Sequence, residues 1–185
     1  MLPNNFTFYI CGRDELKYFT DKQINHFIGF NHPGWTESYN QYNVFEHLGY
    51  IEDFTTFEIH DAFTPEHKHI GLKMPDMNLI ESIVYEGFKI KEKLNQGRQV
   101  NLLVCCAAGI SRSTAATYII LCYLMGEWEE RTALSLVENK RRDARPNPLM
   151  VKLADDYLKR GFKMVSPLKN HLDLGGEKND DCLLW

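Results

Sequence analysis

Cys106 and Arg112 lie six positions apart, in a short stretch whose residue types fit the binding of a phosphate group. An apolar run over residues 100–104 precedes them, and a long apolar run begins at residue 115. A loop that leaves a strand and enters a helix directs its backbone N–H groups at one point, and the helix N-terminus adds partial positive charge. Arg112 can donate two N–H groups to phosphate oxygens. These neighbours favour the anion of Cys106, so we expect a thiolate at neutral pH.

The same stretch has the groups needed to hydrolyse a phosphate ester without a metal or other cofactor. Cys106 would be the nucleophile and form a phosphocysteine. Arg112 and the backbone N–H groups would stabilise the oxygens of the transferred group, and Gly109 permits a close backbone approach. Ser113 would donate a hydrogen bond to the sulfur, although a hydroxyl at the start of a helix can equally satisfy a backbone group. The expected phosphate-binding residues are Ala107, Ala108, Gly109, Ile110, Ser111 and Arg112.

The sequence from Cys106 to Ser113 resembles the signature of the cysteine-dependent protein tyrosine phosphatases, Cys-x5-Arg-Ser/Thr, and is most similar to their dual-specificity branch. The His60-Asp61 pair and residues 147–155 and 161–165 are similar to a bacterial group of tyrosine-phosphatase-like proteins. The resemblance implies an enzyme that hydrolyses phosphotyrosine, and also phosphoserine or phosphothreonine, through a phosphocysteine. The partner that it implies is a phosphorylated protein or peptide.

The leaving group needs a proton from a carboxylic acid on a separate loop. Asp61 follows an expected strand, at the place where the resemblance puts the acid of the family. Asp76 lies at a spacing from Cys106 closer to that of compact dual-specificity enzymes, but a helix pattern follows it at once, so Asp76 also fits a helix N-cap. We favour Asp61 as the acid, with Asp76 as the alternative and another acid, such as Asp53, as a third option.

One residue departs from the family pattern, because relatives carry histidine immediately before the nucleophile and this chain carries Cys105. In the family, that histidine helps to orient the loop and favours the thiolate. We therefore expect the thiolate of Cys106 to form less readily than in histidine-bearing relatives. Alternation along a strand places Cys105 on the opposite side from Cys106, so we expect Cys105 to be buried and not a second nucleophile.

Two alternatives to a protein phosphatase stay open. The first keeps the chemistry and changes the substrate, as in an RNA 5′-phosphatase or a phosphoinositide phosphatase. Such enzymes often carry basic residues inside the loop, where this chain has Ala107, Ala108 and Ile110. The second is a catalytically weak module that binds phosphorylated residues, which only Cys105 favours.

Hydrophobic patterns along the chain predict an α/β fold with a central, mainly parallel sheet flanked by helices, as in protein tyrosine phosphatases. Strands are expected over residues 6–11, 24–30, 54–59 and 100–104, and a loop over residues 62–74. Helices are expected after Asp76 and over residues 115–125, 128–140 and 149–160. We predict one phosphatase domain over residues 1–165 and a mobile C-terminal tail over residues 166–185.

Composition limits the compartment and the partners. The net charge of −4 argues against binding to nucleic acid or to an anionic membrane. We see no signal peptide and no apolar run long enough to span a bilayer. The five cysteines are odd in number and lack Cys-x2-Cys spacing, which favours a reducing cytoplasm.

Three further groups of residues allow two interpretations each, one structural and one functional. A metal site at the histidines near Glu66 is conceivable because His67 and His69 would share a face in a strand, but we expect polar loop residues and no metal. Arg141 and Arg142 read as a solvated helix end, with contact to an anionic substrate as the alternative. The aromatic residues either line a substrate cleft or pack in the core. The histidines are His60, His67 and His69, and the aromatic residues are Trp35, Tyr39 and Tyr42.

Overall fold

The structure is a computed structural model and describes residues 2–34 and 51–168. Strands and helices alternate through the first part of the chain, and helices follow. The strands are β1 (Phe6–Gly12), β2 (His26–Asn31), β3 (Asp53–Glu58) and β4 (Val100–Cys106). The helices are the 3-10 helix η1 (Arg13–Phe19) and the α-helices α2 (Pro65–His69), α3 (Met77–Asn95), α4 (Arg112–Met125), α5 (Glu130–Lys140) and α6 (Pro148–Tyr157).

The four strands form one sheet in the order β1-β4-β2-β3, and every pair is parallel. Gly12 at the end of β1 pairs with Cys106 at the end of β4. The carboxyl ends of all four strands therefore meet at one edge, the edge at which open α/β sheets bind their ligands. This arrangement confirms the predicted α/β fold with a mainly parallel sheet.

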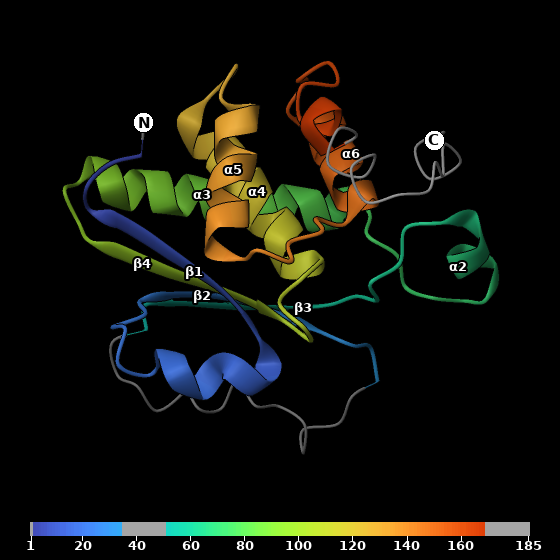
Figure 1. The fold of residues 1–185 in the computed structure, drawn as a ribbon, viewed down its shortest axis with the longest axis horizontal. Helices are drawn as coiled ribbons and strands as arrows, with labels where there is room; N and C mark the ends of the chain where they lie inside the picture. Colours follow the sequence, from blue (N-terminus) through green and yellow to red (C-terminus); the bar gives the residue numbers. More distant parts are fainter. Residues whose placement is uncertain (1, 35–50, 169–185) are drawn as a thin grey trace.

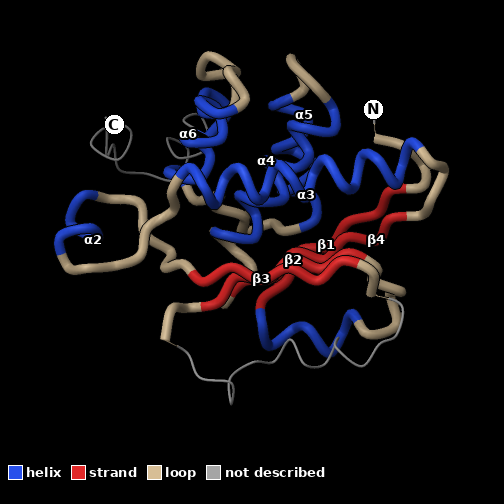
Figure 2. The backbone as a smooth tube through the Cα atoms, turned by 180° about the vertical axis from the view of Figure 1, so that it is seen from behind, coloured by secondary structure: helices blue, strands red, loops and turns tan. Residues whose placement is uncertain are grey.

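Helices cover the two faces of the sheet unequally. Helices α3, α4, α5 and α6 lie on one face, and η1 lies on the other (Figures 1 and 2). Strand β4 divides its side chains between these layers, because successive residues of a strand point to opposite faces. Val104 and Cys106 belong to the large core under the α-helices. Leu103 and Cys105 belong to a smaller core that includes Leu16 of η1.

Helix α4 confirms the prediction of a buried helix behind the loop that follows Cys106. Every side chain from Arg112 to Cys122 is buried, because the helix lies between the sheet and the other helices. A helix that is apolar nearly all round requires such an environment. Within the described residues, no helix combines the length and the apolar character needed to cross a bilayer.

The predicted loop over residues 62–74 is wrong at its centre, where helix α2 lies. Proline at the first position of a helix is favoured, since its missing N–H has no intrahelical partner there. His67 lies in this helix, and its Nδ1 accepts the backbone N–H groups of Phe63 and Thr64 at 3.1 and 3.2 Å. The alternative in which His67 and His69 share the face of a strand is therefore wrong.

The C-terminal part of the chain is described only as far as Leu168, which is 3% exposed and belongs to the large core. The rest of the predicted tail, residues 169–185, lies outside the described residues. So do the aromatic residues discussed above, Trp35, Tyr39 and Tyr42.

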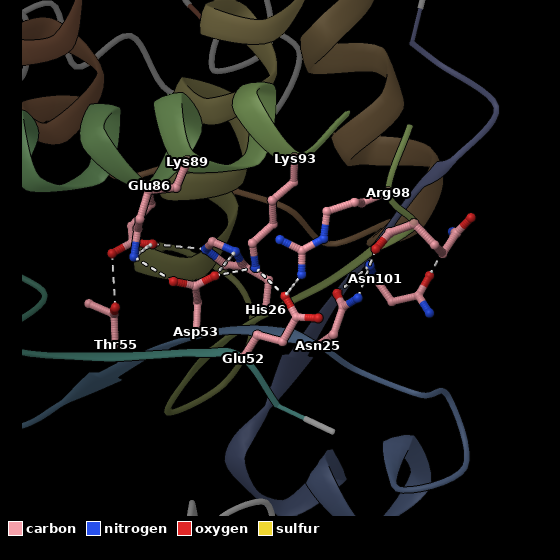
Figure 3. A network of polar contacts seen from close by, with 11 residues as sticks. Asn25, His26, Glu52, Asp53, Thr55, Glu86, Lys89, Lys93, Arg98 and Asn101 are labelled. Carbon is pink, nitrogen blue, oxygen red and sulfur yellow. Dashed lines mark hydrogen bonds and ion pairs between the residues drawn. The ribbon is translucent and has the colours of Figure 1, made fainter. Parts of the chain in front are cut away.

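A network of charged side chains occupies the amino-terminal edge of the sheet, opposite the site edge (Figure 3). Its centre is His26, which is 0% exposed. His26 Nε2 lies 2.8 Å from Glu86 Oε2, and His26 Nδ1 lies 3.4 Å from Asp53 Oδ2. Lys89 contacts both carboxylates, and Thr55 donates a hydrogen bond to Glu86.

This network removes Asp53 from the candidates for the catalytic acid. The contact with His26, opposed by burial and joined by Lys93 and Lys89, holds the pKa of Asp53 far below its ordinary value. Asp53 begins strand β3, whereas the loop after Cys106 follows the end of strand β4. A carboxylate held in its ionised form at the far edge of the sheet has no proton to give and cannot reach the site.

Replacing Glu86 by leucine is expected to lower the free energy of unfolding by about 3–5 kcal/mol, because it leaves His26 without its closest partner. The folded state lowers the pKa values of Asp53 and Glu86. Their stabilisation is therefore complete above their unfolded values of about 4, and it is lost as the pH falls through the lower folded values.

The variant should accordingly show a shallower loss of stability below about pH 4. Urea unfolding across pH measures both effects. Glu81→Leu, at an exposed position of the same helix, is the matched control and should change stability by no more than about 0.5 kcal/mol. Equal losses in the two variants would contradict the assignment.

Candidate active site

The loop between β4 and α4 surrounds the sulfur of Cys106. Gly109 donates its backbone N–H to Cys106 Sγ at 3.2 Å, and Ser113 Oγ lies 3.2 Å from the same sulfur. Cys106 is 2% exposed, and Ser113 is fully buried in the first turn of α4. The Ser113 hydroxyl therefore lies at the sulfur, as the first of its two predicted roles requires, and can donate a hydrogen bond to a thiolate there.

The carbonyl groups of the loop accept hydrogen bonds from the surrounding protein. Ala107 O accepts from the Arg13 backbone at 3.1 Å, and Ile110 O accepts from the Arg145 backbone at 2.9 Å. In a planar trans peptide, the C=O and the following N–H point in opposite directions. Each carbonyl held by the surrounding protein therefore turns the next N–H away from that partner. This orientation is consistent with a nest of donors in the loop, which stays a prediction.

Gly109 has a φ of +76°, in the left-handed region that favours glycine. A Cβ atom at this position would lie 2.5 Å from Gly12 N and 2.6 Å from the Cys11 carbonyl carbon. The contact is with backbone, which cannot move aside as a flexible side chain can. Gly109 therefore lets the loop pack directly against the end of strand β1.

Gly109→Ala should displace the loop. The left-handed backbone alone costs alanine about 1–2 kcal/mol, and the clash adds to this cost. We expect the affinity for inorganic phosphate to fall by about tenfold or more, since 1.4 kcal/mol corresponds to tenfold. Calorimetric titration measures this loss. Gly97→Ala, at a helix end with nothing within 4 Å of the new Cβ, should leave phosphate affinity unchanged although its φ is also positive.

The guanidinium group of Arg112 is oriented by the ends of two strands. Arg112 Nη1 donates to Ile59 O at 2.7 Å and to Asn31 O at 3.4 Å. Arg112 is 3% exposed, and its buried Nε has no hydrogen-bond partner within the described residues. A buried N–H that protein groups leave unsatisfied is available for an oxyanion.

Asp61 lies against the loop between β4 and α4. Ser111 Oγ donates to Asp61 Oδ1 at 2.7 Å, and Asn147 Nδ2 donates to the same oxygen at 2.8 Å. Asn147 is itself fixed, because its Oδ1 caps helix α6 by accepting from Met150 N at 3.1 Å. One oxygen of Asp61 is thus anchored, and the other has no contact with these two donors.

Asp76 lies elsewhere and has a structural role. It is the N-cap of helix α3, where its Oδ1 accepts the backbone N–H of Leu79 at 2.9 Å. This confirms the N-cap that the sequence pattern predicts. The two carboxylates therefore differ in their surroundings, since only Asp61 contacts the loop that holds Cys106.

Cys105 confirms the prediction of a buried residue on the opposite face of β4. It is 0% exposed and packs with Cys11, Ile24 and Phe27 in the smaller core. Burial raises the pKa of the Cys105 thiol well above its ordinary value, and the contact with Cys11 adds to this effect. A thiol that stays protonated is not a nucleophile.

Two histidines lie beside Arg112 and Asp61, at the ends of strands β2 and β3. The His32 and His60 rings meet edge to face, with centroids 4.8 Å apart. Burial lowers the pKa of His32, and the charge of Arg112 lowers it further, so the ring is neutral at neutral pH. His60 Nδ1 accepts the Lys73 backbone N–H at 2.9 Å. In the described part of the chain, no three His, Cys, Asp or Glu residues cluster closely enough to hold a metal ion.

Several residues of the site had no recognised role in the sequence. The sequence pattern assigns Asn147 no side-chain role, predicts a backbone rather than a hydroxyl role for Ser111, and favours a solvated helix end for Arg141. Arg141 instead contacts the loop, as described below. The position of Gly12 directly after an apolar strand was the one available signal that the loop packs against the end of β1.

The chain has the fold of the cysteine-dependent tyrosine and dual-specificity phosphatases, which confirms the resemblance of its loop sequence at the level of fold. Human DUSP28 is 13% identical with a TM-score of 0.55, over 82% of this chain and 91% of that chain. Tk-PTP in its active form is 16% identical with a TM-score of 0.52, over 86% of this chain and 95% of that chain.

A third structure, Cydia pomonella PTP-2 phosphatase, is 13% identical with a TM-score of 0.54, over 80% of this chain and 84% of that chain. No protein-family model matches the sequence, and no curated protein sequence matches it. The likeness is thus visible in the arrangement of strands and helices, while most positions differ in sequence.

Proposed function

We propose that this chain is a cysteine-dependent phosphatase that hydrolyses phosphotyrosine in proteins or peptides, and also phosphoserine or phosphothreonine. The observation that carries the proposal is the loop around Cys106, in which an amide and a hydroxyl contact the sulfur, and the buried Arg112 has an N–H without a partner among the residues that the structure describes. The phosphatase fold supports it.

In the first step, the Cys106 thiolate attacks phosphorus, and the bond from phosphorus to the leaving oxygen breaks. The N–H groups of the loop and Arg112 bind the three phosphoryl oxygens. Asp61 gives its proton to the leaving oxygen from the carboxyl oxygen that is not anchored by Ser111 and Asn147. The product of this step is a phosphocysteine.

In the second step, Asp61 removes a proton from water, and the water oxygen attacks phosphorus as the bond to sulfur breaks. Ser113 donates its hydrogen bond to the departing thiolate. The cycle ends with inorganic phosphate in the loop and Asp61 protonated again, so that protons and phosphate balance. We further propose a reducing, cytoplasmic location, which the four described cysteines support because all are free thiols.

The experiment is an assay of phosphate release from p-nitrophenyl phosphate and from a phosphotyrosine peptide across pH. A phosphoserine peptide tests the second part of the proposal, and a phosphoinositide and 5′-triphosphorylated RNA are tested in parallel as competing substrates. Faster release from the phosphotyrosine peptide supports the proposal. A preference for the phosphoinositide or the RNA would identify that molecule as the substrate in place of a phosphorylated peptide. Binding of the peptide without release of phosphate would indicate a phosphoresidue-binding module.

A further inference from the structure

Arg141, directly after helix α5, contacts two separate parts of the site edge. Its Nη1 donates to both carboxylate oxygens of Glu15 in η1, at 2.9 and 2.8 Å. Its Nη2 donates to Ala108 O in the phosphate-binding loop at 2.8 Å. Glu15 in turn accepts the backbone N–H of Gly12 at 2.6 Å. A planar fork of donors can satisfy both partners at once, whereas a point charge cannot.

The contact with Ala108 O bears on the sulfur of Cys106. Ala108 O and Gly109 N belong to one peptide, so they point in opposite directions. Arg141 holds the oxygen on one side, and Gly109 N–H donates to Cys106 Sγ on the other. Of the other loop carbonyls described above, that of Ala107 accepts from the Arg13 backbone N–H, and that of Ile110 accepts from the Arg145 backbone N–H and from the Thr114 hydroxyl in the next turn of the chain. The Ala108 carbonyl is held by the side chain of Arg141, which comes from a separate part of the chain.

We propose that Arg141, oriented by Glu15, is a positioning residue that fixes the Ala108–Gly109 peptide and thereby stabilises the thiolate of Cys106. Without Arg141, this peptide can rotate and turn its carbonyl oxygen toward the sulfur. The N–H that favours the anion would then be replaced by an oxygen that opposes it. The inference rests on the proposed function, because it assigns a role to the thiolate that the reaction uses.

Charge and burial are consistent with a permanent contact. Burial raises the pKa of Glu15, but the hydrogen bonds from Arg141 and Gly12 outweigh it, so the net pKa lies below the ordinary value. Glu15 therefore stays ionised at neutral pH. The side chain of Arg141 is 20% exposed and that of Glu15 is 40% exposed, so both are open to substitution without leaving a charge buried in the core.

The test measures the pH midpoint of Cys106 alkylation by iodoacetamide in Arg141→Gln, Arg141→Lys and Glu15→Gln. Lysine keeps the positive charge but lacks the planar guanidinium group whose two Nη atoms donate to Glu15 and Ala108. We expect both Arg141 variants to raise the midpoint by about one pH unit, a tenfold loss of thiolate at a given pH. Glu15→Gln should raise it by less. Arg131→Gln, at an exposed position of helix α5, is the control and should leave the midpoint unchanged.

Urea unfolding of the same variants separates this role from a purely structural one. A lower stability with an unmoved midpoint would overturn the inference, and so would an Arg141→Lys variant that alkylates like the unaltered chain, since charge alone would then suffice. Failure of the proposed function is distinguishable, because it would show as absence of phosphate release by the unaltered chain, whereas alkylation needs no turnover.

Discussion

Replacing Cys106 by serine is expected to abolish phosphate release while the chain still binds inorganic phosphate. The serine hydroxyl stays protonated at neutral pH and is a far weaker nucleophile than a thiolate. The groups that bind the oxyanion remain, since the loop N–H donors and Arg112 are held by other parts of the protein. Phosphate release and phosphate affinity, measured on the same preparation, separate the two effects.

Two further variants make this expectation specific. Arg112→Ala should weaken both release and binding, because it removes the guanidinium donors. Cys105→Ala should retain most of the turnover, because Cys105 faces the smaller core on the other side of β4. A Cys106→Ser variant that keeps more than a few per cent of the activity would show that the phosphocysteine mechanism is wrong.

Asp61→Asn is expected to slow hydrolysis of a phosphotyrosine peptide by about 10²–10⁴-fold, the usual contribution of general acid catalysis. The amide oxygen of asparagine can accept the same bonds from Ser111 and Asn147. The substitution therefore removes the proton and leaves the geometry of the site intact. The loss should be smaller for p-nitrophenyl phosphate, whose leaving group needs less help from a proton.

Asp76→Asn is the matched control for the acid. Asparagine caps a helix about as well as aspartate, so the helix that Asp76 begins should persist and the rate should change little. A large loss in Asp76→Asn together with a small one in Asp61→Asn would transfer the role to Asp76. The ratio of the rates on the two substrates is the readout, since a change of stability alone would lower both rates equally.

Local patterns in the sequence were enough to predict the α/β fold and the position of the loop between β4 and α4. Strand β4 and helix α4 are apolar runs on either side of Cys106 and Arg112, and their order along the chain determines how the loop must bend. The cap of α3 at Asp76 was equally local. Helix α2 is missing from the prediction because proline and glycine in residues 62–74 indicate a loop, although proline also starts helices.

Contacts between residues far apart in the sequence could not be predicted in the same way. Asn147 reaches Asp61 across 86 positions, and Arg141 reaches Glu15 across 126. Such pairs depend on how the α-helices and η1 lie at the ends of the strands, which hydrophobic periodicity does not define. The same holds for the carbonyl groups of Asn31 and Ile59, because every residue carries one and only the fold selects these two for Arg112.

The hydrogen bonds to the loop carbonyls also affect the thermodynamics of ligand binding. The carbonyl groups of Ala107, Ala108 and Ile110 already accept hydrogen bonds from the protein, so a loop that binds phosphate as proposed would offer preorganised donors. Little of the binding free energy would then be lost in ordering the backbone, and the donors would not need to reorganise as charge develops on the oxygens. The same preorganisation would favour the phosphate ion as much as the ester, so we expect the product to be retained tightly.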